Sequence, residues 1–332
     1  MMNATPSSSS SVRPVKRFGV PGSTATQLRT ALSALTSSPY DDLESFEHDS
    51  ADVLRRALPA TCLQYLDSLR LRDDSTTALL IEGLPVDPGL RSTPNNPLER
   101  TDTSTHLSEG CLLGLGRLLG RAYAFKAEKC GAIVHNVLPV RGREAEYSSE
   151  GSVTPFQFHT EVAAHPASPD YILLSCLRAN CEHNASTVVA DVARACAKLD
   201  GEALDALQRE DFELLSPQSF RSTRAHFVCR VLQRVGSDFE ARLNLNGMRA
   251  LSDRGRVALA RFAEALAAEG VVSSVQLRAG DLLVIDNRRS VHGRTGFSPR
   301  YDGADRWLQR IYVRKELWAT TSDLVYPSRV IE

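Results

Sequence analysis

The chain has 332 residues, 42% of them hydrophobic and 24% charged, which is ordinary for a soluble globular protein. Basic and acidic residues nearly cancel, 39 against 40, and this balance excludes the strongly basic surface typical of nucleic-acid binding or membrane attachment. No apolar run is long enough to cross a bilayer. We therefore expect no nucleic-acid partner and no membrane partner.

The cysteines and the N-terminal segment indicate where the protein works. The 7 cysteines are odd in number and show no metal-ligand spacing, so we expect mostly buried, reduced thiols and a cytoplasmic location. Residues 1–16 are rich in serine and lack the apolar core of a signal peptide. We interpret them as a disordered tail and residues 17–332 as a single domain, of unknown oligomeric state.

Helical spacing of leucines predicts two helices after the tail. The first is capped by Ser23 or Thr24, and the second begins at Asp49 or Ser50. Pro59 predicts a kink or a break in the second helix.

A buried strand over residues 77–81 and an apolar helix over residues 108–122 come next. The helix contains glycines at positions 114, 116 and 120. Their spacing does not match a phosphate-binding loop, so we expect them to allow close packing.

Beyond Gly131 the pattern changes to many short strands, interrupted by a helix over residues 253–268. The predicted strands are residues 132–138, 154–159, 171–177, 187–189, 212–215, 225–235, 239–245, 271–277, 281–286 and 307–313. Short strands with long excursions predict an α+β fold with a double-stranded β-helix (jelly-roll) core and flanking helices.

Three residues in two of these strand regions form a candidate metal site. His159 and Glu161 are two residues apart, so on an extended segment their side chains emerge on one face. His292 follows another apolar strand and would supply a second imidazole. Two histidines and one carboxylate form the facial triad of non-haem Fe(II) oxygenases, with open coordination positions. A buried structural role for His292 is the alternative.

Two arginines lie shortly after His292. Arg306 and Arg310 are four residues apart on a predicted strand and therefore share a face. Guanidinium groups match carboxylates bidentately. The pair predicts a site that receives two carboxylates next to the metal.

The sequence resembles the clavaminate-synthase-like branch of the Fe(II)/2-oxoglutarate oxygenases, and within it the asparagine and arginine oxygenases of peptide-antibiotic pathways. The likeness runs from about residue 120 to residue 313. It is dense in residues 158–163 (FHTEVA) and from residue 286 to residue 310, including residues 299–310 (PRYDGADRWLQR). The resemblance implies a dioxygenase that uses Fe(II), 2-oxoglutarate and O2 to hydroxylate a small-molecule substrate, a free L-amino acid, at C3.

The resemblance also implies which residues bind the co-substrate and the substrate backbone. Arg306 would bind the distal carboxylate of 2-oxoglutarate, with Thr187 as a second contact. Arg310 would bind the α-carboxylate of the amino acid, Glu128 its α-amino group, and Ser149 its backbone. The alternatives are a salt bridge from Arg306 to Asp302 or Asp305, simple packing of Thr187, and a solvated surface position for Glu128.

The expected side-chain pocket contains Asn246, Gly247 and Met248. The resembling arginine enzymes carry an acidic pair at this position, whereas an uncharged Asn and an apolar Met cannot neutralise a guanidinium. We therefore expect a neutral substrate side chain, such as that of asparagine. Asn246 could instead be an ordinary turn residue beside Gly247.

Other outcomes stay open at this point. The polar residues 216–225 could form a lid over the substrate or a passive loop. The same fold could carry out desaturation or cyclisation, or act on an arginine-type or carrier-bound substrate. A metal-binding jelly roll without catalysis is the alternative from another functional class.

Overall fold

Continuous apolar sequence in the strands already indicates that the central sheet is covered on both faces. In the computed structural model, β14 (Leu282–Asp286) is buried at every position, and β6 (Tyr171–Arg178) at all but the last. Leu282 and Val284 pack against helices, whereas Leu283 and Ile285 point into the space between two sheets. A strand with two buried faces is expected to be apolar throughout rather than alternating.

The structure describes residues 15–100, 105–180, 182, 185–215, 226–317, 324–325 and 329–331. Among them, nine strands form the larger sheet, with β4 paired to β16 beside the main order β1-β2-β14-β6-β16-β3-β18-β17. Besides β6 and β14, these are β1 (Val15–Gly19), β2 (Ala78–Glu82), β3 (Arg121–Phe125), β4 (His135–Val137), β16 (Trp307–Arg314), β17 (Leu324–Val325) and β18 (Val330–Ile331).

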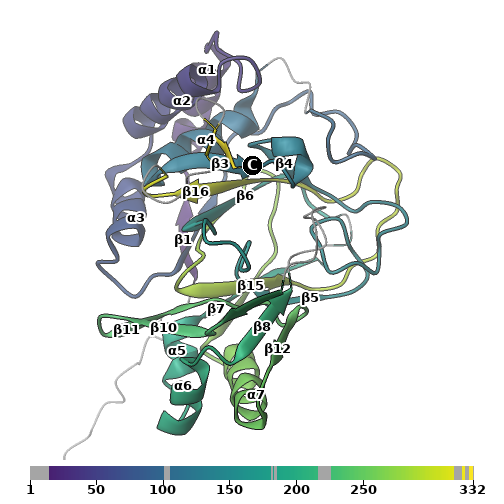
Figure 1. The fold of residues 1–332 in the computed structure, drawn as a ribbon. Helices are drawn as coiled ribbons and strands as arrows, with labels where there is room; N and C mark the ends of the chain where they lie inside the picture. Colours follow the sequence, from purple (N-terminus) through teal and green to yellow (C-terminus); the bar gives the residue numbers. More distant parts are fainter. Residues whose placement is uncertain are drawn as a thin grey trace, which may run out of the picture.

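A smaller sheet faces the larger one, as Figure 1 shows. It has the order β13-β7-β15-β5, with β5 (Phe156–His159), β7 (Thr187–Asp191), β13 (Val272–Val275) and β15 (Ser290–Arg294). Residues from both sheets, among them Leu174, Val189 and Leu308, form one apolar cluster between them. Two packed sheets around a shared core agree with the predicted jelly roll.

Five short strands form two further small sheets, with the orders β10-β11 and β12-β8-β9. They are β8 (Phe212–Leu215), β9 (His226–Cys229), β10 (Leu232–Val235), β11 (Asp238–Ala241) and β12 (Met248–Ala250). After β11 the chain runs beside β5, where Thr160 donates its backbone N–H to the carbonyl oxygen of Leu243. This contact brings residues 244–247 next to His159, with which Asn244 forms an isolated bridge.

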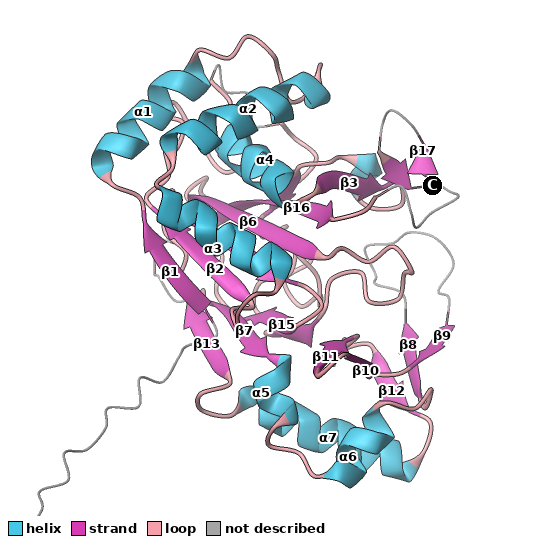
Figure 2. Ribbon diagram, turned by 90° about the vertical axis from the view of Figure 1, so that its left-hand side faces the viewer, coloured by secondary structure: helices cyan, strands magenta, loops and turns pink. Residues whose placement is uncertain are grey.

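The helices form two groups (Figure 2). The first group covers the outer face of the larger sheet, and the second lies at the end of the smaller one. They are α1 (Gly22–Ser33), α2 (Leu43–Ala57), α3 (Ala60–Leu71) and α4 (Leu107–Leu119), and then α5 (Val192–Cys196), α6 (Gly201–Leu207) and α7 (Asp253–Ala267), with a 3-10 turn at Lys129–Gly131. None of the described helices is long and apolar enough to cross a bilayer.

Some helix boundaries differ from the sequence prediction. The second helix begins at Leu43, because the Asp42 side chain accepts the backbone N–H of Ser45 and caps it. Pro59 does break the helix, as predicted. The helix predicted over residues 108–122 ends at Leu119 in the structure. Ala122, the last residue of the predicted helix, lies in β3.

The start of the fold also differs from the prediction. Val15 and Lys16, which we assigned to the N-terminal tail, begin β1 and pair with Ala78 and Leu79 of β2. The rest of that tail and the predicted lid at residues 216–225 lie outside the described residues. The cysteines that the structure describes are all unpaired thiols, and all of them except Cys130 are buried.

Gly114 lies where α4 crosses α2 in close contact. A Cβ atom at this position would come within 2.5 Å of the Leu54 side chain and 2.9 Å of the Ser50 backbone. We expect Gly114→Val to lower the free energy of unfolding by about 1–3 kcal/mol, because overpacking forces backbone shifts. Urea unfolding tests this, with Gly201→Val in α6 as the control, since no atom lies within 4 Å there. Equal losses in both variants would contradict the packing role.

Candidate metal and substrate site

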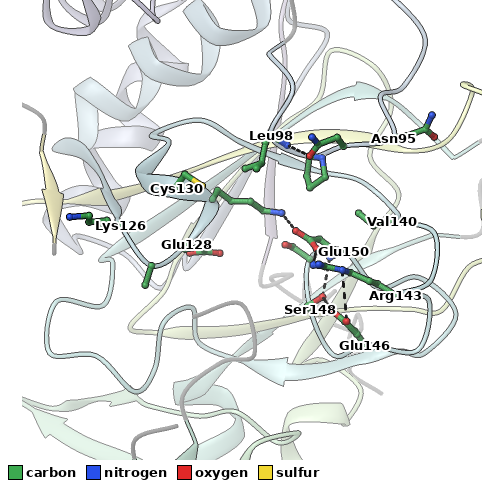
Figure 3. A pocket seen from close by; sticks show the side chains of 15 residues that line it. Asn95, Leu98, Lys126, Glu128, Cys130, Val140, Arg143, Glu146, Ser148 and Glu150 are labelled. Carbon is green, nitrogen blue, oxygen red and sulfur yellow. Dashed lines mark hydrogen bonds and ion pairs between the residues drawn. The ribbon is translucent and has the colours of Figure 1, made fainter. Parts of the chain in front are cut away.

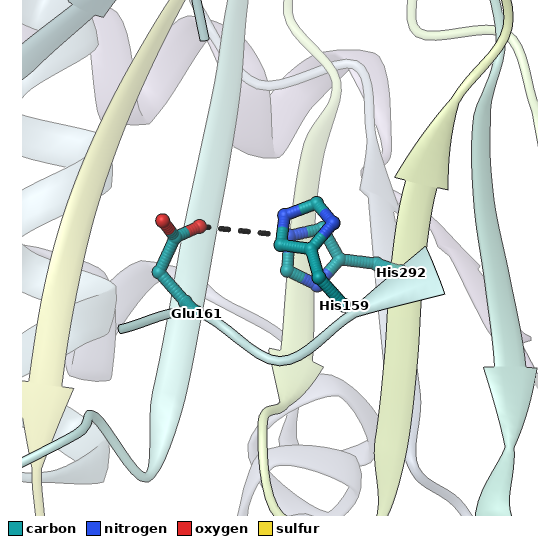
Figure 4. A group of neighbouring side chains, drawn as sticks. All are labelled: His159, Glu161 and His292. Carbon is teal, nitrogen blue, oxygen red and sulfur yellow. Dashed lines mark ion pairs between the residues drawn. The ribbon is translucent and has the colours of Figure 1, made fainter. Parts of the chain in front are cut away.

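Two histidines face each other across neighbouring strands. His159 at the end of β5 and His292 in β15 are register partners in an antiparallel pair. Their ring centroids are 4.2 Å apart, and Figure 4 shows both rings on the same side of the sheet. The ring of Phe156 stacks on His159 at 3.9 Å and fixes its orientation. Sheet pairing therefore brings together two imidazoles that are far apart in the sequence.

Glu161 reaches the histidines by a turn rather than along an extended strand. β5 ends at His159, and Glu161 begins a turn in which Val162 has a φ of 51°. The Asn287 side chain accepts the Glu161 backbone N–H at 2.7 Å and donates to the Glu161 carbonyl oxygen at 3.2 Å. Glu161 therefore lies near His159, as expected, but a turn brings it there rather than an extended strand.

The three side chains fit a divalent metal ion. One ligand atom from each lies within 4.8 Å of the others, and Glu161 Oε2 is 3.6 Å from His292 Nε2. His159 Nδ1 donates to the carbonyl oxygen of Gln157 at 2.8 Å, which leaves its Nε2 lone pair for a metal. Burial lowers the pKa of His159 to about 3, so the ring is neutral, as metal binding requires.

The carboxylate of Glu161 is ionised despite its burial. Burial alone would raise its pKa, but the Arg310 guanidinium and the two histidines outweigh burial and hold the pKa below its ordinary value. Arg310 Nη1 lies 3.1 Å from Glu161 Oε1. The site therefore provides two imidazoles and one carboxylate, the donor set of a facial triad.

A narrow cavity of about 60 Å³ beside the triad contains the predicted co-substrate residues. Arg306 and Thr187 both line it, and an Arg306 Nη2 atom lies 3.4 Å from Thr187 Oγ1. Burial lowers the pKa of Arg306 to about 10, so the guanidinium remains charged. No described carboxylate forms an ion pair with it, because Asp302 pairs with Arg300 and Asp305 accepts the backbone N–H groups of Arg300 and Tyr301. The alternative considered for Arg306, a salt bridge to Asp302 or Asp305, is therefore not formed among the described residues.

A second cavity, of about 130 Å³, adjoins the triad at His159 and Glu161. Arg310 and Glu128 line it and pair at 2.8 Å, with 5% and 3% of their surfaces exposed. The surface position considered for Glu128 is therefore wrong. Arg310 Nε is buried with no hydrogen-bond partner, which leaves a donor for an incoming anion.

Ser149, Asn246 and Gly247 also line this second cavity. Met248, expected in the same pocket, does not line it and packs against neighbouring apolar clusters instead. The Asn246 side-chain oxygen accepts the backbone N–H of Gln157 at 3.1 Å. Asn246 is at the same time in a turn over residues 245–247, so the turn interpretation and a place at the cavity are both correct.

A third cavity is also lined by Glu128 and Ser149. Figure 3 shows this cavity from close by. This cavity has a volume of about 570 Å³ and shares both residues with the second cavity. Across it, the Glu150 carboxylate pairs with Lys129 and Arg143. The Lys129 ion pair connects the loop after β4, which carries Ser149, to the segment that carries Glu128, whereas Arg143 lies in the same loop as Glu150.

Sequence reasoning missed two side chains of this network. Tyr312 contacts Glu128 and Glu161 through its hydroxyl, and His135 Nδ1 lies 3.0 Å from Arg310 Nη2. Tyr312 is two residues after Arg310 on β16, and this spacing could have indicated a shared face.

A jelly roll that holds two imidazoles and a carboxylate at its mouth, with open positions left, defines a mononuclear non-haem iron oxygenase. Residues 103–312 match the family described as taurine catabolism dioxygenase TauD, TfdA family. The chain belongs to this family and is a dioxygenase.

Individual relatives agree with this assignment. The chain is 37% identical to L-asparagine oxygenase of Streptomyces coelicolor over 83% of its length and 82% of the relative's. It is 34% identical to clavaminate synthase 2 of Streptomyces clavuligerus, over 87% and 90% of the two chains.

A solved structure of an asparagine oxygenase with Fe(II), 2S,3S-3-hydroxyasparagine and succinate superposes with a TM-score of 0.86. The identity is 31%, over 95% of this chain and 98% of that one. Succinate is the product of oxidative decarboxylation of 2-oxoglutarate. The predictions of a jelly-roll fold, a clavaminate-synthase-like dioxygenase, and iron with 2-oxoglutarate are confirmed.

Proposed function

We propose that the protein hydroxylates a free L-amino acid with an uncharged side chain, such as asparagine, at C3. The observation that carries this proposal is the buried Arg310–Glu128 pair on the wall of the cavity beside the triad. A free amino acid is a zwitterion, with a carboxylate for Arg310 and an ammonium group for Glu128. A carrier-bound substrate has no free carboxylate and would leave Arg310 unmatched.

His159, Glu161 and His292 would hold the iron, which when bound activates O2 at the expense of 2-oxoglutarate. Arg306 and Thr187 would bind the distal carboxylate of 2-oxoglutarate in the narrow cavity, where an unpaired buried guanidinium favours an anion. The protein would then position the co-substrate and the amino acid against the metal, because both cavities are lined by His159 and Glu161.

Glu128 and Arg310 would orient the amino acid in the second cavity. Arg310 Nε supplies a donor that the free protein leaves unused. Ser149, on the shared wall of both cavities, is placed to contact the substrate backbone. Fixing both charged ends of the backbone aims the adjacent side-chain carbon at the metal, which favours C3 over more distant positions.

The lining of the second cavity favours an uncharged side chain. Its described carboxylates are Glu128 and Glu161; the first would bind the substrate ammonium group and the second the metal, so neither is left for a charged side chain. The oxygen of Asn246 is occupied by the Gln157 N–H, so this amide offers only N–H donors. A substrate amide can accept from it through its carbonyl oxygen, whereas a guanidinium has donors alone.

We expect asparagine to be hydroxylated at least about tenfold more efficiently than arginine, a difference of roughly 1.4 kcal/mol. A guanidinium would lose its hydration in this cavity without gaining an anionic partner. Competition between the two amino acids in one reaction, with products quantified by mass, measures the ratio directly.

L-Citrulline is the matched control, because it has the length of arginine without the charge. If charge decides, citrulline should be accepted better than arginine. Preferential oxidation of arginine would show that acidic groups outside Asn246, Gly247 and Met248 reach the cavity. The substrate proposal would then fail, whereas the assignment of the iron site would not.

A further inference from the structure

Tyr312 connects the two carboxylates of the site. It is 1% exposed, and its hydroxyl lies 2.8 Å from Glu128 Oε2 and 3.1 Å from Glu161 Oε1. Glu128 follows β3, and Glu161 follows β5. One side chain on β16 therefore contacts both the group proposed to bind the substrate ammonium and the group proposed to bind the metal.

A phenol has a single O–H hydrogen and can donate it fully to only one of these oxygens. In the free protein the shorter contact is to Glu128, which also accepts from Arg310. A substrate ammonium group would bring three donors to Glu128. The hydroxyl would then be released from Glu128 and could turn to Glu161.

We propose that Tyr312 is a positioning residue that transfers its hydrogen bond from Glu128 to Glu161 when the amino acid binds, and thereby keeps Glu161 Oε1 from the metal. This inference rests on the proposed function, since it requires an amino acid whose ammonium group binds Glu128.

The two oxygens of Glu161 already have different surroundings. Oε2 faces His292 Nε2 at 3.6 Å, whereas Oε1 faces Arg310 Nη1 and the Tyr312 hydroxyl, each at 3.1 Å. Groups that hold the outer oxygen of a carboxylate ligand orient its inner oxygen. If Oε1 were released, both oxygens could bind the metal and fill a position that the co-substrates need.

A purely structural role makes a different prediction. The Tyr312 ring packs in an apolar cluster with Tyr123 and Phe125 and lies 4.7 Å from the Arg310 guanidinium. Loss of packing alone would lower stability without changing how the metal responds to the amino acid. That response is therefore the informative measurement.

The test compares the wild type with Tyr312→Phe after loading with Co(II) and 2-oxoglutarate without oxygen. L-Asparagine is titrated while calorimetry follows its binding and visible absorption follows the cobalt. We expect asparagine to intensify the cobalt bands in the wild type, as coordination number falls, but not in Tyr312→Phe.

Tyr171→Phe is the matched control. Tyr171 is also buried on the larger sheet, but its hydroxyl contacts only the backbone oxygens of Leu69 and Arg70, at 3.4 and 3.5 Å. This variant should respond like the wild type. The same cobalt response in Tyr312→Phe as in the wild type would overturn the inference, and absence of asparagine binding to the wild type would overturn the proposed function with it.

Two unnatural residues at position 312 keep the test decisive if Tyr312→Phe does not fold. p-Aminophenylalanine retains N–H donors at the position of the hydroxyl and should restore the response. p-Fluorophenylalanine fills the same space without a donor and should not. A wild-type response in the fluoro variant would show that packing, rather than the hydrogen bond, is what matters.

Discussion

His159→Ala, Glu161→Ala and His292→Ala are each expected to abolish 2-oxoglutarate turnover. Each variant removes one of the three ligand atoms that lie within 4.8 Å of one another, and a metal left with two protein ligands is loosely held. Succinate formation measures the turnover, and calorimetry with Fe(II) in the absence of oxygen measures metal binding. Both should fall below detection or by several orders of magnitude.

His48→Ala is the control for these variants, because His48 lies on α2 with its side chain 64% exposed. It should retain activity and metal binding. Normal activity in any two of the three ligand variants would contradict the assignment of the triad. Retained metal binding with lost turnover in all three would place the metal elsewhere.

Arg306→Ala is expected to raise the Michaelis constant for 2-oxoglutarate by roughly tenfold to a thousandfold, the value of a buried charge-assisted pair. The Michaelis constant for the amino acid should change far less, because Arg306 lines only the narrow cavity. Arg306→Lys keeps the charge but loses the bidentate geometry and should give an intermediate value. Steady-state kinetics with each substrate varied in turn measures both constants.

Stability provides an independent test of Arg306. Its guanidinium is buried without an anionic partner, and removing an uncompensated buried charge does not weaken a fold in the way that breaking a pair does. We therefore expect the ligand-free Arg306→Ala protein to unfold at a temperature no lower than that of the wild type. Unchanged affinity for 2-oxoglutarate would show that Arg306 is structural.

The sequence indicates the candidate metal site because the signals for it are local or periodic. The spacing of His159 and Glu161, with one residue between them, and the apolar strand before His292 are visible without any tertiary structure. The sequence does not show which contact brings Glu161 to the two histidines. Glu161 is placed by the Asn287 side chain, a contact that depends on sheet packing rather than on the spacing from His159.

The end of α4 and the ion pairs of the site were harder to predict, because both depend on contacts between distant segments. A Cβ atom at Gly120 would come within 2.2 Å of the Arg314 carbonyl oxygen on β16, so the need for glycine directly after α4 arises from a contact with a distant segment. Glu128 resembles a surface residue in sequence, because its partner Arg310 comes from a distant strand. Tyr312 resembles an ordinary core aromatic residue until the positions of Glu128 and Glu161 are known.

The central claim is hydroxylation of a free, uncharged amino acid by an Fe(II)/2-oxoglutarate dioxygenase. Its most direct test incubates the protein with Fe(II), 2-oxoglutarate, isotopically labelled O2 and the twenty standard amino acids, followed by mass spectrometry. We predict that an uncharged amino acid, with asparagine as the first candidate, gains one labelled oxygen atom for each succinate formed. Loss of two hydrogens without a gain of oxygen, or succinate formation with no amino acid changed, would contradict it.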